Sequence, residues 1–257
     1  MIPLHFEPKI HSFSQVSSTN EILRDLALKG ASEGTVVVSR SQSHGRGRLG
    51  REWRSPLGGL YVSVLLYPLT PQRITDLPFL VAVAVVQSLE QILPKACTTS
   101  LKWPNDILVD RKKMGGILAE AFGEDQFYGG IVGLGINVNT TLKDLEDFQE
   151  RPFQATSVAA LIQGQETDLD SLLQIFLAKL FNLYRLYQEK GFAPIRALWE
   201  RNCAMVGKEI EIRDVEPKGE TLKGKFWGIS ERGGLLLDLG SSEKREILSG
   251  DLTCCWF

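Results

Sequence analysis

A glycine- and arginine-rich stretch is the first candidate for chemistry. SHGRGRLGREW, residues 43–53, has three glycines and three arginines, and Arg54 follows it. Gly45, Gly47 and Gly50 have the G-x-G-x-x-G spacing of dinucleotide-binding loops. Each arginine is permanently charged and can hold a phosphate or carboxylate through two hydrogen bonds. The stretch therefore predicts an anion-binding loop, and the first question is whether the anion is a dinucleotide.

The context of this loop argues against a dinucleotide. A Rossmann loop leads from a strand into a helix, and an acidic residue about 20 positions later holds the ribose. The apolar run GTVVVSR (34–40) precedes the loop, but Pro56 and two glycines follow it and lead into another strand. Residues 65–75 contain no Asp or Glu, and the chain contains no Walker A sequence. Two alternatives stay open, a solvated basic loop such as an RNA-binding patch and a flexible phosphate- or carboxylate-binding loop.

Trp53 favours the second alternative. An indole next to Arg46, Arg48 and Arg51 can stack on an adenine while the guanidinium groups hold phosphate. The glycines allow the backbone to approach a ligand closely or to rearrange. The net charge of −2 provides no global field for nucleic acid, so any basic function of this chain is expected to be local.

The segment LKWPNDILV, residues 101–109, is a second candidate. Its Pro-Asn-Asp sequence has turn composition, and a tight turn is the simplest interpretation. Lys102, Asn105 and Asp106 nevertheless place a cation, an amide and a carboxylate within five residues at the end of a predicted strand. These groups suit contacts with phosphate, with a nucleotide, and with magnesium or a substrate amine, respectively.

Lys113 and Asn137 are further candidates. Lys113 lies where a predicted hairpin re-enters the sheet, two residues before a Gly-Gly pair that permits close approach of a ligand. The neighbouring Arg111 and Lys112 are interpreted as a solvated hairpin tip. Asn137, in GLGINVN (133–139), offers an amide to a base above a glycine-rich strand floor. The alternative for this strand is tight packing against a helix.

The elements that must position these residues follow from patterning. Ser18 and Glu21 predict a capping box at the start of a helix that Gly30 ends. The backbone N–H groups and hydroxyls of SSTN (17–20) could also hold a small polar ligand. The other elements predicted before residue 205 are strands over 34–40 and 58–67, a long buried helix over 75–93, a strand, turn and hairpin over 99–122, a strand over 128–140 and helices over about 155–163, 169–190 and 193–202. After Cys203, short alternating strands with glycine-rich turns predict a small all-β barrel. We therefore expect two domains, 1–205 and 206–257.

Composition limits the class of protein. The chain has 257 residues, of which 43% are hydrophobic and 23% charged, as in a soluble globular protein. Its four cysteines and three histidines show no zinc-site spacing, which favours a reducing compartment. The N-terminus has no signal-peptide pattern, and the longest apolar run, 77–86, is too short to span a bilayer. The default expectation is a cytoplasmic protein.

Together, these stretches resemble the biotin protein ligase family. The motifs agree in order and spacing, and the resemblance covers essentially the whole chain. The arginine loop and KWPND are specific to this family, whereas the other motifs are weak alone. The matching stretches are SSTN at 17–20, QSHGRGRLGREW at 42–53, KWPNDI at 102–107, KMGGIL at 113–118 and GLGIN at 133–137.

The resemblance implies an α+β fold and a two-step reaction. The fold is a mixed β-sheet with helices on one side, of the class II aminoacyl-tRNA synthetase-like or biotin–lipoate ligase type, plus a small C-terminal SH3-like β-barrel. Biotin and ATP, with Mg²⁺, give biotinyl-5′-AMP, and biotin then passes to a lysine of a biotin carboxyl carrier protein domain of acetyl-CoA carboxylase or a similar carboxylase. Since the chain begins almost directly at the catalytic domain, the resemblance implies the ligase-only type. We expect no DNA or membrane binding, and a monomer or homodimer.

The resemblance also implies roles for individual residues. The implied catalytic residues are Lys113, Arg48 and Arg51. The implied biotin-binding residues are Ser18, Thr19, Asn20, Gln42, Gly45, Arg46, Gly47, Arg48, Lys113 and Gly116. The implied ATP-binding residues are Arg48, Arg51, Trp53, Lys102, Asn105, Asp106, Lys113 and Asn137. Asp106 is also the expected Mg²⁺ ligand. Leu49 departs from the pattern, because some relatives have another arginine at this position.

The chemistry accounts for a cationic, mobile loop. Two anions must meet in the first step, so preorganised cations must neutralise the developing charge. The product is a hydrolysable anhydride, so the site must close over it. The glycines of the loop therefore suit an ordering transition on ligand binding.

Two other functions remain as alternatives. A lipoate–protein ligase shares the fold and the acyl-adenylate chemistry, but KWPND and the GRGRxGRxW loop argue against it. A nucleic-acid-binding module would use the arginine loop and the barrel. The net charge of −2 and the absence of a basic stripe interleaved with aromatic residues argue against that class.

Overall fold

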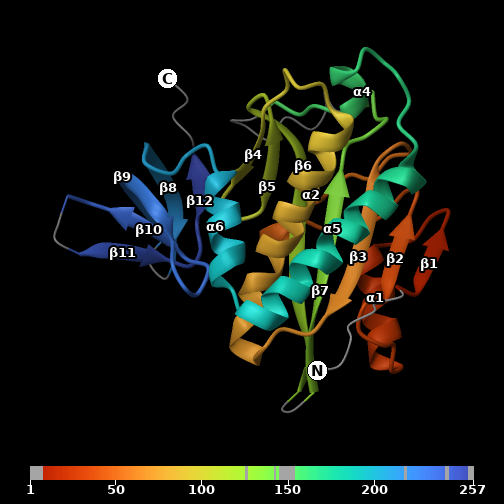
Figure 1. Cartoon of the computed structure of the whole chain (residues 1–257), viewed down its shortest axis with the longest axis horizontal. Helices are drawn as coiled ribbons and strands as arrows, with labels where there is room; N and C mark the ends of the chain where they lie inside the picture. The colour runs from red at the N-terminus through yellow and green to blue at the C-terminus, as the bar shows by residue number, and fades with distance from the viewer. Residues whose placement is uncertain are drawn as a thin grey trace.

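The computed structural model describes residues 8–124, 127–141, 143–144, 154–216, 219–240 and 243–253, and it contains two β-sheets (Figure 1). The larger sheet has seven strands in the order β1-β2-β3-β7-β6-β5-β4. It is mixed, because β1 pairs with β2 in parallel and the other neighbours are antiparallel. Its strands are β1 (Ile10–Phe13), β2 (Val36–Ser39), β3 (Leu60–Leu66), β4 (Thr99–Lys102), β5 (Asp106–Val109), β6 (Lys112–Glu124) and β7 (Phe127–Ile136).

The two faces of this sheet have different partners. All seven residues of β3 are buried, and they alternate between the faces. Val62 and Val64 belong to the main hydrophobic core, which also contains residues of the long helices, whereas Leu65 belongs to a small cluster with Leu23 of the first helix. Ser63 points the same way as Leu65 and is fully buried. This polar position on the second face lies beside the site described below.

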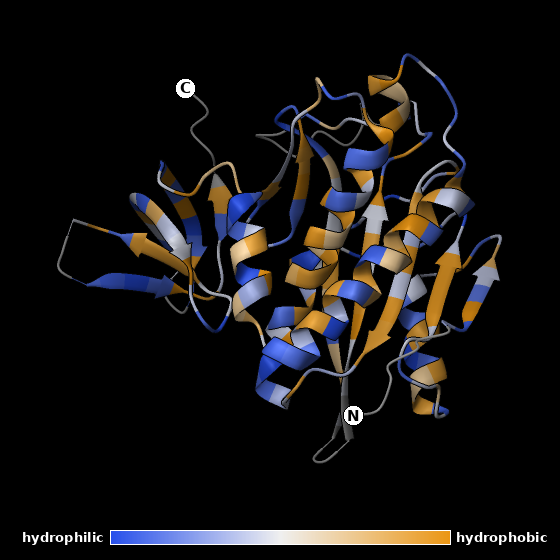
Figure 2. Ribbon diagram, in the orientation of Figure 1, coloured by the Kyte–Doolittle hydropathy of each residue, from blue (hydrophilic) through white to orange (hydrophobic). Residues whose placement is uncertain are grey.

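The long helices cover one face, as predicted. They are α2 (Leu77–Ile92), α5 (Leu169–Lys190) and α6 (Ala193–Arg201). Figure 2 shows α2 and the central strands as largely hydrophobic. The segment Pro71–Ile92 is long and apolar enough to cross a membrane, but 67% of its most apolar window is buried inside the protein, as in a core helix. The short helix α1 (Thr19–Leu28) is the exception, because it packs on the opposite face against β2, β3 and β7.

The smaller sheet is antiparallel and consistent with a small barrel-like domain. Its order is β11-β10-β9-β8-β12, with β8 (Glu209–Val215), β9 (Glu220–Ile229), β10 (Leu235–Asp238), β11 (Lys244–Ile247) and β12 (Asp251–Thr253). Its turn at 231–233 meets the 3₁₀ helix that precedes α2 and the turn after β4. Arg73 donates to the carbonyl of Glu231 at 2.6 Å, and Trp103 Nε1 donates to the carbonyl of Gly233 at 3.2 Å.

Some sequence-based boundaries were wrong. The helix predicted over 75–93 begins as the 3₁₀ helix η2 (Pro71–Asp76), with Pro78 in the first turn of α2. The helix predicted over about 155–163 is only α4 (Val158–Leu161). The capping box is absent: Ser18 is the N-cap residue of α1, but its side chain makes no capping hydrogen bond, and Glu21 accepts from the hydroxyl of Ser17 at 2.6 Å. The hydroxyl of Ser18 is thus not used by the helix.

Candidate active site

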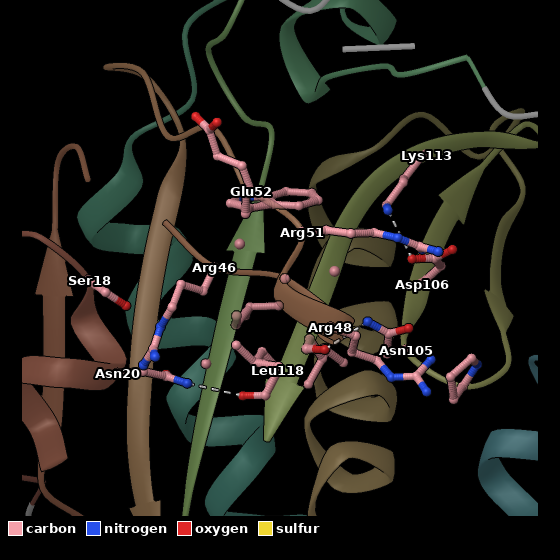
Figure 3. Close-up of a pocket in the computed structure, with 18 of the residues that line it drawn as sticks. Ser18, Asn20, Arg46, Arg48, Arg51, Glu52, Asn105, Asp106, Lys113 and Leu118 are labelled. Atoms are coloured by element: carbon pink, nitrogen blue, oxygen red, sulfur yellow. Dashed lines mark hydrogen bonds and ion pairs between the residues drawn. The ribbon is translucent and has the colours of Figure 1, made fainter. Parts of the chain in front are cut away.

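A cavity of about 450 Å³ lies on the α1 face of the large sheet (Figure 3). The N-terminus of α1, strands β4–β7, the arginine loop and the end of the small sheet all contribute to it. Of the residues predicted for the site, it brings together Ser18, Thr19, Asn20, Gln42, Arg46, Gly47, Arg48, Arg51, Trp53, Lys102, Asn105, Asp106, Lys113 and Gly116. The predicted residues therefore meet at one place, although the sequence separates them by up to 98 positions.

Glycines make the floor of the cavity. In the antiparallel register Gly116 of β6 faces Gly135 of β7. A Cβ atom at Gly135 would lie 2.4 Å from Trp53 Nε1, and one at Gly133 would lie 2.3 Å from Asn20 Oδ1. Side chains at these positions would thus displace Trp53 and Asn20. The interpretation of GLGIN as a strand floor agrees with this geometry.

One end of the cavity is built from neutral polar groups at the start of α1. The backbone N–H of Thr19 donates to Gln42 Oε1 at 2.8 Å, and the hydroxyl of Thr19 lies 3.1 Å from the same oxygen. Gln42 Nε2 in turn donates to the hydroxyl of Ser55 at 2.7 Å. This chain of bonds fixes the orientation of the Gln42 amide. Ser18 completes this end of the cavity (Figure 3).

Arg46 reaches the same end from the loop. Its guanidinium lies 3.2 Å from the carboxylate of Glu120 on β6 and 3.9 Å from that of Glu21 on α1. Asn20 Nδ2 donates to the same Glu120 oxygen at 2.7 Å. Figure 3 shows Arg46 and Asn20 close together at this end of the cavity.

The other end of the cavity is cationic. Asp106 lies between two ammonium groups, with Lys102 Nζ at 3.0 Å from Oδ2 and Lys113 Nζ at 3.2 Å from Oδ1. Burial alone would raise the pKa of Asp106, but the two lysines outweigh it, and the pKa is lowered from its ordinary value. Asp106 is therefore ionised at neutral pH and holds both lysines in place.

The two central loop arginines face this end. Arg48, in the 3₁₀ turn η1 (Arg48–Gly50), has a lowered pKa, mainly because it is buried, although Asp251 and Asp106 favour its charged form. Arg51 pairs with Asp251 of β12. The small sheet thus contributes a carboxylate, that of Asp251, which pairs with an arginine at the cationic end.

Trp53 lies between the two ends. Its ring faces Gly116 and Gly135, and Lys113 Nζ is 5.4 Å from its ring centroid. Its indole Nε1 is buried and has no hydrogen-bond partner in the part of the chain that the structure describes. A buried N–H without a partner is rare and marks a donor that a bound ligand can satisfy.

Two predicted residues lie apart from the cavity. Gly45 is a buried residue of the loop, and a Cβ atom there would clash with the carbonyl of Trp53 at 2.1 Å. Asn137 is buried, and its Nδ2 donates to the carbonyl of Thr156 at 3.1 Å. Neither residue lines the cavity, so their roles in ligand binding stay predictions.

Sequence reasoning missed other lining residues, namely Glu52, Pro104, Ile117, Leu118, Asp251 and Leu252, whereas Gly133, Leu134 and Gly135 belong to the strand that it predicted as the floor. The alternation of β6 and β7 provides a signal for Leu118, Gly133 and Gly135, because they share a sheet face with Gly116. No comparable signal exists for Asp251 and Leu252, which lie in another sheet.

The donors of the site do not fit a magnesium ion held by protein ligands. Both oxygens of Asp106 already face ammonium groups. The described residues contain no group of three or more His, Cys, Asp or Glu side chains that could hold a metal. The prediction that Asp106 binds Mg²⁺ therefore has no support in this arrangement.

Comparisons with known proteins identify the family to which this fold and this site belong. Residues 12–137 match the sequence profile of the biotin/lipoate A/B protein ligase family, and residues 206–252 match that of the biotin protein ligase C terminal domain. Two curated relatives extend the match. The bifunctional ligase/repressor BirA of Bacillus subtilis (strain 168) is 38% identical over 240 residues, which cover 92% of this chain and 71% of that protein. The biotin–[acetyl-CoA-carboxylase] ligase of Paracoccus denitrificans is 29% identical over 228 residues, or 87% of this chain and 92% of that protein.

A solved structure agrees in fold. The biotin protein ligase from Aquifex aeolicus, in complex with biotin and ATP, superposes with a TM-score of 0.78 and 34% sequence identity, over 96% of this chain and 98% of that one. The chain belongs to the biotin protein ligase family.

Proposed function

We propose that this chain joins biotin to a carrier protein in two steps that consume ATP. A biotin carboxylate oxygen attacks the α-phosphorus of ATP, which forms biotinyl-5′-AMP and releases pyrophosphate. The ε-amine of a carrier lysine then attacks the acyl carbon. An amide forms, AMP leaves, and the amine gives up a proton.

The observation that carries this proposal is the two-ended cavity. Neutral hydrogen-bonding groups at the start of α1 and on Gln42 suit a polar uncharged ring, whereas Arg48, Arg51 and Lys113 suit phosphate and carboxylate. The cavity has the size of a small-molecule site. A molecule with a neutral head and an anionic tail, activated by a nucleotide, matches this division.

In the first step the cations bring two anions together. Lys113, on β6, contacts Asp106 at 3.2 Å, and Arg48 belongs to the arginine loop. We assign to both the neutralisation of charge as the carboxylate approaches the α-phosphate. Asp106 acts through the lysines that it holds, and Lys102 adds charge beside it.

The second step requires a protected intermediate. The arginine loop crosses the cavity and pairs through Arg51 with Asp251, so the small sheet bounds the same space. We infer that loop and small sheet together shield the anhydride from water until the carrier lysine enters. Trp53 Nε1 would donate to the bound intermediate.

Several finer assignments belong to this proposal. Mg²⁺ would enter with the phosphates of ATP, as part of the substrate. The partner would be a biotin carboxyl carrier domain of acetyl-CoA carboxylase or a similar carboxylase. We place the boundary between the catalytic and C-terminal domains at 205/206, and the roles of Gly45 and Asn137 remain as predicted from the resemblance.

Mass spectrometry of a purified biotin carrier domain provides the test. The domain is incubated with this protein, ATP, Mg²⁺ and either biotin or lipoate. We expect the mass of one biotin to be added, and no addition when ATP is withheld. Addition of lipoate alone would assign the chain to lipoate ligation instead. If neither acid is added, pyrophosphate release without the carrier separates an unsuitable carrier from a wrong function.

A further inference from the structure

Glu120 lies next to the cavity without lining it. It is on β6, two residues after Leu118, and its side chain is 21% exposed. Its Oε2 accepts from Asn20 Nδ2 at 2.7 Å and from the guanidinium of Arg46 at 3.2 Å. Its Oε1 lies 3.7 Å from the guanidinium of Arg24. One carboxylate thus holds two groups that do line the cavity.

These two groups come from distant parts of the chain. Asn20 is in the first turn of α1, and Arg46 is on the arginine loop. Backbone hydrogen bonds from Trp53 to Gly45 and from Gly47 to Arg51 hold the backbone on both sides of Arg46, whereas its long side chain is oriented by its ion pairs. The ion pair with Glu120 adds a side-chain link between the loop and the sheet at the α1 end of the cavity.

Glu120 and the backbone carbonyl of Leu118, which lies 3.4 Å from Asn20 Nδ2, together fix how the Asn20 amide is turned (Figure 3). Asn20 Oδ1 is 2.6 Å from the hydroxyl of Ser63, and Nδ2 faces Glu120. A carboxylate can only accept, so the amide must direct its NH₂ group to Glu120 and its oxygen to Ser63. Gly133 leaves the room that Oδ1 occupies, because a Cβ atom at this position would lie 2.3 Å from it.

We propose that Glu120 is a positioning residue for biotin recognition, because it holds Asn20 and Arg46 in place before biotin binds. It thereby links closure of the arginine loop, residues 43–54, to binding of the ureido ring of biotin. The proposal rests on the function inferred above. Glu120 contacts Asn20 and Arg46, whereas Lys113, Arg48 and Arg51 lie toward the other end of the cavity (Figure 3). Its effect is therefore confined to the acid substrate and to the loop.

The first experiment measures KM for each substrate by pyrophosphate release. Glu120→Gln keeps the shape of the side chain but removes the charge and one acceptor. We expect KM for biotin to rise about tenfold, the value of one charge-assisted hydrogen bond, while KM for ATP and kcat stay within about twofold. The matched control is Glu21→Gln, which removes a carboxylate 3.9 Å from the same guanidinium and which has no contact with Asn20 in the described hydrogen bonds. It should change KM for biotin less than about twofold.

The second experiment reads the loop without any turnover. Limited trypsin digestion of the ligand-free protein cleaves after the loop arginines when the loop detaches from the sheet. We expect cleavage in Glu120→Gln to be several-fold faster than in wild type, and cleavage in Glu21→Gln to match wild type. Glu120→Asp, which withdraws the charge by one methylene, should fall between wild type and Glu120→Gln in both assays, and it decides the question if Glu120→Gln does not fold.

The outcomes separate the two proposals. If wild type does not activate biotin, the proposed function fails, and trypsin digestion still tests whether Glu120 holds the loop. Unchanged digestion, or a KM for biotin that does not rise relative to KM for ATP, overturns the positioning role. An equal effect of Glu21→Gln would assign the change to surface charge and likewise overturn it.

Discussion

At the scale of single residues, the carboxylate of Asp106 holds the two lysines that we assign to the cationic end of the cavity. Asp106 holds Lys102 and Lys113 at 3.0 and 3.2 Å, and the lysines in turn lower the pKa of Asp106. Such a cluster delivers ammonium groups to a fixed position without leaving a buried charge unpaired. KWPND and KMGGIL were separate motifs in the sequence. The structure joins them into one unit, with Asp106 as its centre.

Lys113→Ala tests the cationic end. We expect pyrophosphate release without a carrier to slow by about 10²–10³, because one preorganised charge is lost from the transition state. The fold should persist, since Lys102 still pairs with Asp106. Lys112→Ala, an exposed neighbour, is the control. Wild-type pyrophosphate release in Lys113→Ala would remove this lysine from the mechanism.

At the scale of elements, the glycine positions of β7 and the arginine loop depend on each other. The loop can place Trp53 over the sheet because Gly135 of β7 has no side chain beneath the indole. Leu49, at the loop tip, has φ 56° and is 69% exposed, a left-handed conformation that is costly for a leucine. Hydrogen bonds across the tip, from Gly47 to Arg51 at 2.7 Å and from Arg51 to Arg48 at 3.1 Å, hold this turn.

Gly135→Ala tests this dependence. Its Cβ atom would lie 2.4 Å from the indole nitrogen of Trp53, whereas a Cβ atom at Gly116 would come no closer than 3.4 Å to the ring. We expect Gly135→Ala to displace the indole and to raise KM for ATP about tenfold, or else to cost about 1–3 kcal/mol of stability through overpacking. The effect of Gly116→Ala on KM for ATP should be several-fold smaller. Steady-state kinetics and urea unfolding measure both, and equal effects of the two variants would contradict the assigned packing.

Arg48→Gly tests closure of the loop. Removing the partly buried guanidinium should let biotinyl-5′-AMP escape before transfer, at a rate at least about tenfold above wild type. Release is followed by trapping free biotinyl-5′-AMP with hydroxylamine. Arg54→Gly lies in the same segment but does not line the cavity, and it should release the intermediate as wild type does. A wild-type leakage rate in Arg48→Gly would contradict the closure argument.

At the scale of the whole molecule, the small sheet is part of the site and is docked through a buried carboxylate. Asp251 and Leu252 line the cavity. A second contact joins the small sheet to the helix before α2. There Arg73 donates to Asp76 Oδ2 at 2.7 Å and to the carbonyl of Glu231 in the small sheet. Asp76 also accepts from the hydroxyl of Tyr187 at 3.1 Å, while its Oδ1 is buried without a partner within the described residues.

Asp76 predicts a pH dependence of stability. Burial raises its pKa from 3.8 to about 6, against the opposing effects of Arg73 and Tyr187. The folded protein thus binds this proton more tightly than the unfolded chain does, so the contribution of Asp76 to stability is greatest below about pH 4 and is lost as the pH rises to about 6. Asp76→Asn does not titrate here. We expect its stability relative to wild type to increase between about pH 4 and pH 7 in urea unfolding, and parallel pH profiles would contradict the shifted pKa.

Much of the fold follows from local pattern. Strands and long helices were predictable because hydrophobic periodicity and turn residues act over a few positions. Errors occurred at ends, where capping and 3₁₀ turns compete, as at Ser18 and at Pro71–Asp76. Most of the predicted site residues line one cavity because their motifs lie at strand ends and on the glycine-rich strands of one sheet face.

The sequence by itself determined which groups carry the chemistry, namely the loop arginines, the lysines of KWPND and KMGGIL, and the glycines of GLGIN. Only the tertiary structure decided which carboxylates partner them. Glu120 meets Arg46 across 74 positions, and Asp251 meets Arg51 across 200. The physical reason is that residue type and short spacing act locally, whereas pairing across a sheet or between two sheets depends on strand register and on the packing of the whole chain.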